Sequence, residues 1–375
     1  MKKTAFTLSL LMLSFLIFAC ASSPSVYDSR LEKFQTATAE EILSQMTTEE
    51  KIAQLFVICP EQLEPESLKK ASRKFSSLLQ KYPVGGFIFF GRNLENPAQT
   101  RAFLSELRDK SLLPPILSID EEGGRVARLA RSENFFLPKF RNMDSVGRTK
   151  DPENARGAGQ IIGSYLATFG FNLDFAPVVD VNTNPDNIVI GDRAFGSEPE
   201  SVSDMAGAFL SGLHSTGVKG CIKHFPGHGD TKGDTHLDYV AVTKDWEELK
   251  KCELIPFVKN ISSADCVMVA HVTCSKIDSS FPASLSKILI TEKLRGELGY
   301  QGLILTDSLR MKAISKNYGS DRACVLAFEA GNDILLMPAN FYKSYEAMLE
   351  AVRSGRISMA RLDESLLRIL HFKGL

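Results

Sequence analysis

The sequence predicts an α/β fold, a (β/α)8 TIM barrel built as a single domain. Short apolar runs alternate with longer segments of helical period, which indicates parallel strands covered by helices on both faces of the sheet. Unusual polar residues follow the carboxyl ends of these runs, and in a closed barrel all such ends meet at one rim. An open doubly wound sheet, the alternative, would spread the same residues along a crevice.

The amino-terminal region is expected to direct export rather than to join the barrel. Two lysines precede an apolar run, residues 6–18, that is too short to span a bilayer. Cys20 follows this run and a small residue, which resembles a bacterial lipoprotein signal with cleavage before Cys20 and lipidation of its thiol. An ordinary secretory signal that contains a cysteine is the alternative. We therefore expect a signal peptide over residues 1–19, a lipidated N-terminus and tether over 20–40, and the barrel over 41–375. The chain would then be anchored to a bacterial membrane of the cell envelope.

Thr47 and Glu50 have the spacing of a capping box, so a helix should begin there. The expected strands are residues 54–58, 86–90, 116–119, 173–179, 220–222, 266–270, 303–305 and 333–337. The expected helices between them are residues 98–111, 155–169, 201–215, 245–262, 286–298, 320–330 and 341–354, and residues 356–375 should form a closing helix.

Charge and cysteine content exclude several classes of protein. The chain has 44 basic and 45 acidic residues, so it lacks the electrostatic footprint of a nucleic-acid-binding protein. The six cysteines beyond Cys20 show neither the CxxC spacing of a metal site nor a close pairing pattern. The glycine-rich loops match no nucleotide-binding pattern, and no cofactor is expected.

Residues 223–236 are the most informative part of the chain, because three of its six histidines lie there among aspartates and glycines. A core segment would be apolar, and a solvated loop would rarely collect histidines. A polar loop directly after a buried strand is where catalytic groups tend to be mounted. A metal site is one interpretation, but Pro226 and Gly227 prevent His224 and His228 from sharing a helix face. We expect no metal.

An acid–base pair fits the same segment better. Asp234 lies two residues from His236, so its carboxylate can bond one ring nitrogen and fix the tautomer. Histidine titrates near neutral pH, so His236 can donate a proton and then accept one. Asp307, directly after an apolar run, either caps the next helix or faces a substrate. Its place on the shared rim favours a nucleophile, as in double-displacement glycoside hydrolysis, although a histidine proton shuttle is unusual there.

Further charged residues at the strand ends are candidate ligand contacts. Each alone is more often a salt-bridge partner, but together on one rim they favour binding of sugar hydroxyls. Arginine clamps also bind phosphate or carboxylate, so they do not identify the substrate. The candidates are Asp120, Arg128, Arg193, Lys223 and His224.

The chain resembles the single-domain β-N-acetylglucosaminidases of glycoside hydrolase family 3. The strongest match is residues 223–231 leading to Asp234-Thr235-His236, and supporting segments are residues 85–93, 120–126, 175–181, 190–196 and 330–333. The resemblance implies the barrel, Asp307 as nucleophile, Asp234 and His236 as the acid–base dyad, and the five candidate contacts as ligands of the terminal N-acetylglucosamine. Thr235, Glu121 and Ser308 stand where the family usually has serine, glutamine and aspartate. Glu121 thus adds a charge near the pocket.

We therefore expect a retaining exo-β-N-acetylglucosaminidase that acts on peptidoglycan fragments or chitin oligosaccharides and needs no cofactor. A phosphorylase on the same scaffold is a second possibility, because a histidine shuttle does not repel incoming phosphate. A non-catalytic sugar-binding lipoprotein is a third.

Overall fold

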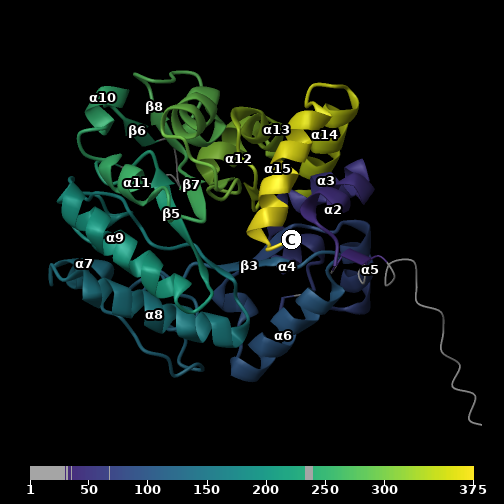
Figure 1. Cartoon of the computed structure of the whole chain (residues 1–375), viewed down its shortest axis with the longest axis horizontal. Coiled ribbons are helices and arrows are strands. Elements are labelled where there is room, and N and C mark those ends of the chain that lie inside the picture. Colours follow the sequence, from purple (N-terminus) through teal and green to yellow (C-terminus); the bar gives the residue numbers. More distant parts are fainter. Residues whose placement is uncertain (1–29, 31–32, 35, 67, 233–239) are drawn as a thin grey trace, which may run out of the picture.

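Eight parallel strands form one sheet that curls into a barrel, with the helices outside it (Figure 1). The computed structural model describes residues 30–375 except 31–32, 35, 67 and 233–239. The sheet order is β10-β1-β2-β3-β4-β5-β7-β9. The ends of this sheet also meet, because Leu305 forms a parallel bridge with Ile334 and the Thr306 amide donates to the Ile334 carbonyl at 3.2 Å. The predicted (β/α)8 barrel is confirmed.

Every expected apolar run overlaps one strand of the barrel. The bounds are β1 Phe56–Ile58, β2 Gly86–Phe89, β3 Ile116–Ile119, β4 Leu173–Asp174, β5 Lys219–Phe225, β7 Cys266–Val269, β9 Leu303–Thr306 and β10 Leu335–Leu336. Two further strands, β6 Val240–Val242 and β8 Val272–Cys274, pair in a small separate sheet.

The main helices follow the expected segments. They are α3 Thr48–Gln54, α6 Pro97–Lys110, α8 Pro152–Phe169, α9 Pro199–His214, α10 Trp246–Leu249, α11 Ile255–Asn260, the π-helix η4 Ile288–Glu297, α13 Ser320–Ala330, α14 Phe341–Arg353 and α15 Met359–Phe372. The predicted capping box is present, since the Thr47 hydroxyl and the Glu50 carboxylate each accept the other residue's amide. Residues 245–262 form two short helices, because Pro256 lacks an amide proton and sits in the first turn of the second helix.

Several shorter helices were not expected from the sequence. They include α2 Ala39–Gln45, α4 Pro60–Leu63, α5 Arg73–Lys81, α7 Met143–Gly147 and α12 Lys312–Tyr318. Contacts with the barrel already begin before residue 41, where Arg30 forms an ion pair with Glu50 and Phe34 is buried. Cys20 lies outside the described residues. Across the part of the chain that is described, no helix combines the length and the apolar character needed to cross a bilayer.

Candidate active site

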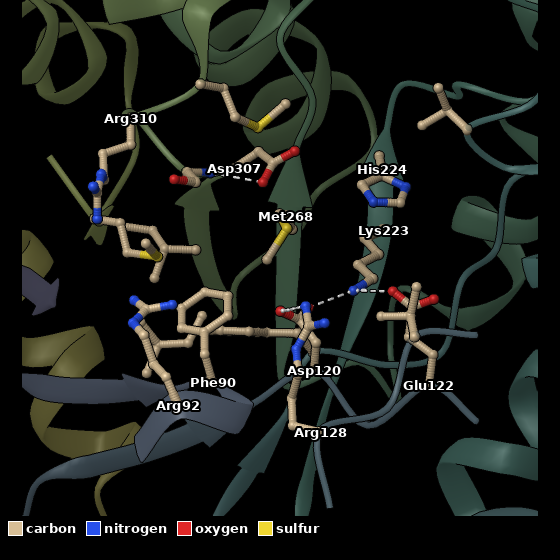
Figure 2. A pocket seen from close by; sticks show the side chains of 18 of the residues that line it. Phe90, Arg92, Asp120, Glu122, Arg128, Lys223, His224, Met268, Asp307 and Arg310 are labelled. Atoms are coloured by element: carbon tan, nitrogen blue, oxygen red, sulfur yellow. Dashed lines mark hydrogen bonds and ion pairs between the residues drawn. The ribbon is translucent and has the colours of Figure 1, made fainter. Parts of the chain in front are cut away.

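A cavity of about 800 Å³ opens at the carboxyl ends of the barrel strands (Figure 2). Its lining residues come from or directly follow β2, β3, β4, β5, β7, β9 and β10, as the strand-end argument predicts. Six of the sequence-predicted residues line it together: Asp120, Arg128, Arg193, Lys223, His224 and Asp307. The predicted dyad, Asp234 and His236, lies outside the described residues.

Lys223 lies at the buried end of the cavity. Its ammonium group is 2.9 Å from Asp120 Oδ1 and 2.5 Å from Glu122 Oε1, and its side chain is only 2% exposed. Asp120 also accepts a bond of 3.1 Å from Arg128. Burial opposes ionisation of Asp120, but the charges of Lys223 and Arg128 outweigh it and lower its pKa. Lys223 and Glu122 therefore hold fixed charges in a place that water scarcely reaches.

Glu122 joins this cluster to Arg193, and sequence reasoning gave Glu122 no role. Arg193 donates two parallel bonds of 2.8 Å to the two carboxylate oxygens of Glu122. Burial raises the pKa of Glu122, but the charges of Arg193 and Lys223 outweigh this and hold it far below its ordinary value. The pairing fixes the plane of the Arg193 guanidinium, because a bidentate contact allows one orientation.

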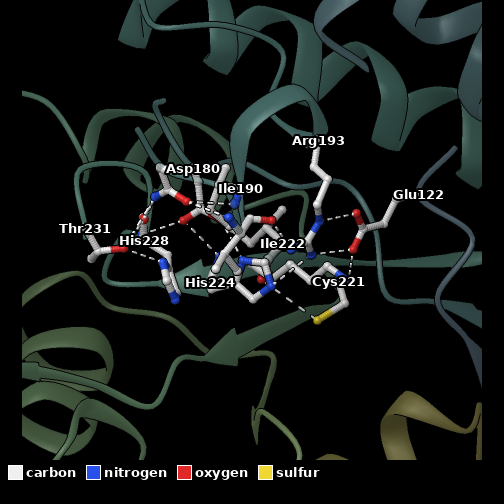
Figure 3. A network of polar contacts seen from close by, with 12 residues as sticks. Glu122, Asp180, Ile190, Arg193, Cys221, Ile222, His224, His228 and Thr231 are labelled. Atoms are coloured by element: carbon white, nitrogen blue, oxygen red, sulfur yellow. Dashed lines mark hydrogen bonds and ion pairs between the residues drawn. The ribbon is translucent and has the colours of Figure 1, made fainter. Parts of the chain in front are cut away.

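Asp180 orients His224, as Figure 3 shows. The carboxylate of Asp180 accepts a bond of 2.6 Å at His224 Nδ1, and it also accepts the His228 amide at 2.7 Å. Burial alone would raise the pKa of Asp180. The charge of His224 and its hydrogen bond to Asp180 have the larger effect, so the pKa of Asp180 is lowered. The carboxylate accepts the proton on Nδ1, and Nε2 of His224 lies 3.3 Å from the Arg193 guanidinium. Sequence reasoning gave Asp180 no role of its own.

Glu121 lies between two residues that line the cavity, Asp120 and Glu122, but does not line it itself. Its carboxylate is fully buried and accepts the backbone amides of Arg128, Leu129 and Ala130 at 2.5–2.9 Å. The Tyr165 hydroxyl donates to it as well, at 3.0 Å. Glu121 therefore holds the loop that presents Arg128 to the cavity.

The segment after β5 packs closely against the loop after β4. A Cβ atom on Gly229 would lie 1.9 Å from the Val181 carbonyl oxygen, and Gly227 has a φ of +127°, which other residues rarely adopt. His228, between them, lines the cavity and has its Nδ1 2.7 Å from the Thr231 hydroxyl. Burial lowers the pKa of His228. Glycine at 227 and 229 thus allows a close backbone approach.

Asp307 follows β9 on the other side of the cavity (Figure 2). Its amide donates to the Val269 carbonyl at 2.9 Å, and its Oδ1 accepts the Ser308 amide at 2.7 Å. The alternative role, capping the next helix, does not apply, because α12 begins at Lys312 and its N-cap is Met311. His271 supports this turn by donating from Nε2 to the Ser308 carbonyl at 2.9 Å.

Phe90 forms an apolar surface at the mouth of the cavity. Two guanidinium groups lie over its ring, Arg92 at 4.6 Å and Arg128 at 5.2 Å from the ring centre. Arg92 is held in turn by an ion pair of 2.5 Å with Glu61. The two guanidinium groups hold the Phe90 ring in position through cation–π contacts. A half-buried aromatic ring of this kind is a suitable contact for the apolar face of a sugar.

Comparison with known proteins identifies the family of this chain. The profile described as Glycosyl hydrolase family 3 N terminal domain matches residues 47–372. The chain belongs to glycosyl hydrolase family 3. The family resemblance stated from the sequence is therefore confirmed, and the match spans the whole barrel from α3 to the end of α15.

Similar proteins are named as hexosaminidases or as a β-N-acetylglucosaminidase. Beta-hexosaminidase A of Pseudoalteromonas piscicida is 33% identical over 90% of this chain, and beta-hexosaminidase LpqI of Mycobacterium tuberculosis is 34% identical over 88% of it. A family 3 β-N-acetylglucosaminidase from a Paenibacillus species has 38% identity and a TM-score of 0.81 over 88% of this chain. The chain spans 62% of the Pseudoalteromonas and Paenibacillus proteins and 83% of the mycobacterial one.

Proposed function

We propose that the protein is a retaining exo-β-N-acetylglucosaminidase that releases terminal N-acetylglucosamine from peptidoglycan fragments or chitin oligosaccharides. One observation carries the proposal: in the cavity, Asp307 lies opposite a set of largely buried charged groups, Asp120, Lys223 and Arg193 among them. Such groups form short, directional bonds to hydroxyls, and a nucleophilic carboxylate suits a covalent glycosyl intermediate. Membership of family 3 and the names of its hexosaminidase relatives support the same activity.

The mechanism has two displacements. A carboxylate oxygen of Asp307 attacks the anomeric carbon while His236 donates its proton to the glycosidic oxygen, and the bond to the aglycone breaks. In the second step His236 takes a proton from water, the oxygen of that water attacks the anomeric carbon, and the ester bond to Asp307 breaks. Asp234 orients His236 and stabilises its imidazolium form. Two inversions restore the original configuration, and no metal or organic cofactor takes part.

The test measures hydrolysis of 4-nitrophenyl β-N-acetylglucosaminide and of 4-nitrophenyl β-glucoside. Each assay contains a chelator and is run both with and without phosphate. We expect turnover of the N-acetylglucosaminide alone, with release of the β-anomer by NMR. Asp307→Ala should lower kcat at least roughly a thousandfold. His236→Ala should slow a natural disaccharide far more than the nitrophenyl substrate, because a good leaving group needs little protonation. The control is Asp109→Ala, which removes an exposed aspartate on α6.

Each contrary outcome has a distinct meaning. Release of sugar 1-phosphate would replace the hydrolase by a phosphorylase, and binding without turnover would support the sugar-binding alternative. Loss of activity with the chelator would show that a metal is required. Equal losses on both substrates in the His236 variant would remove that residue from the acid role.

A further inference from the structure

The cavity contains two cations that have no carboxylate partner among the described residues. Six basic side chains line it, and four of them form ion pairs with acidic residues of the same cavity: Arg92 with Glu61, Arg128 and Lys223 with Asp120, and Arg193 and Lys223 with Glu122. The other two are Arg310 and Lys312. Within the described ranges, neither makes an ion pair or a side-chain hydrogen bond. The wall that carries them therefore has an excess of positive charge.

These two cations lie at the open end of the cavity. Lys223 and Glu122 are almost completely buried, whereas Arg310 and Lys312 are exposed. Arg310 follows Asp307 by three residues and lies with Arg92 across the cavity from Lys223 and Glu122 (Figure 2). The buried end is the part that would enclose a terminal sugar. The group attached to that sugar, on the far side of Asp307, must therefore extend through the open end of the cavity, past Arg310.

We propose that Arg310 and Lys312 bind a carboxylate on the aglycone, the part of the substrate that leaves. The proposal rests on the proposed glycosidase function and narrows its substrate class. The planar guanidinium of Arg310 matches a carboxylate in a bidentate fashion, and Lys312 adds a second charge on the same side. An N-acetylmuramic acid residue carries such a carboxylate on its lactyl ether, whereas a chitin oligosaccharide is neutral. The rim thus favours peptidoglycan fragments over chitin.

The experiment compares three substrates that share the same terminal sugar. They are N-acetylglucosaminyl-β-1,4-N-acetylmuramic acid, the same disaccharide with its lactyl carboxylate converted to the amide, and N,N′-diacetylchitobiose. Each is assayed for kcat/KM with the full-length wild type, Arg310→Gln, Lys312→Gln and the double variant. The matched control is Lys316→Gln, which removes an exposed charge from the same helix, α12, outside the cavity lining.

We expect the wild type to favour the carboxylate substrate over its amide by about 5- to 20-fold, the range of charge-assisted bonds that are partly exposed. The double variant should remove this preference and leave kcat/KM for the amide and for chitobiose within about twofold. Raising the salt concentration should weaken the wild-type preference, because exposed charges are screened.

Three outcomes would overturn the inference while the glycosidase proposal stands. The wild type could hydrolyse the acid and the amide equally, the double variant could lose all three substrates alike, or Lys316→Gln could reproduce the effect. Equal loss would mean that the two residues only position the Asp307 turn. Absence of turnover on every N-acetylglucosaminide would instead refute the proposed function itself.

Discussion

Replacing Glu122 with Gln should destabilise the protein as well as impair its cavity. The Glu122 side chain is 1% exposed and accepts bonds from both Arg193 and Lys223. Glutamine keeps the shape but removes the charge, and its amide group would face donors. Asp120 would then be the nearest carboxylate left for Lys223, and Arg193 would lose its bidentate partner.

The size of the effect follows from the burial. Removing one partner from a buried ion pair costs about 3–5 kcal/mol, because it leaves an uncompensated charge out of contact with water. The unfolding entropy is about 2.1 cal/mol/K per residue, so roughly 340 folded residues give about 0.7 kcal/mol/K. Each kcal/mol therefore lowers Tm by about 1.4 °C, and we expect a decrease of about 4–7 °C.

Scanning calorimetry at pH 7 measures this decrease, with Glu292→Gln as the control for an exposed carboxylate on η4. The pKa of Glu122 is lowered in the folded state, so its contribution is complete above the unfolded pKa near 4.3 and is lost as the pH falls below it. The gap between wild type and variant should therefore narrow from pH 5 to pH 3. A Tm within 1 °C of the wild type at pH 7, or a gap that is constant with pH, would refute the reasoning.

Two other predictions concern different parts of the chain. Asp174 is buried, its Oδ2 has no partner among the described residues, and burial raises its pKa. The stability of the wild type relative to Asp174→Asn should therefore fall as the pH rises from about 4 through the folded pKa of Asp174. Urea midpoints at pH 4, 6 and 8 measure this, and a constant difference would contradict it. We also propose that lipidated Cys20 anchors the protein to the cell envelope, because it follows the apolar run 6–18. Cys20→Ala should move the protein from the membrane fraction to the soluble fraction, and unchanged fractionation would exclude the lipid anchor.

The barrel was predictable because its strands carry a strong local signal. Runs such as residues 116–119 are apolar without interruption, and a parallel strand buried on both faces requires this. Helix α5 gives a weaker signal: it has nine residues and buries only Phe75 and Leu79. The break within 245–262 was foreseeable from Pro256, which starts a helix more readily than it continues one.

The site was predictable only in part, because spacing reveals which residues reach the rim but not which of them pair. Asp120, Glu121 and Glu122 follow one strand directly. Side chains alternate across an extended chain, so residues 120 and 122 share a face and residue 121 points away. The structure has this arrangement, and the alternation was the available signal for Glu122. The role of Asp180 had no comparable signal, since its partner His224 lies on the next strand of the barrel.

The pairing explains how a cavity so rich in charge remains ready for a neutral sugar. Asp120 and Glu122 hold Lys223 and Arg193 in fixed positions before any ligand arrives, so binding requires little rearrangement of charges. Their mutual neutralisation also means that this end of the cavity does not select an anion. The proposal therefore leaves selection by charge to Arg310 and Lys312 at the mouth, which form no ion pair within the described part of the chain. Under the proposed function, recognition of the terminal sugar would thus be separate from recognition of the group attached to it.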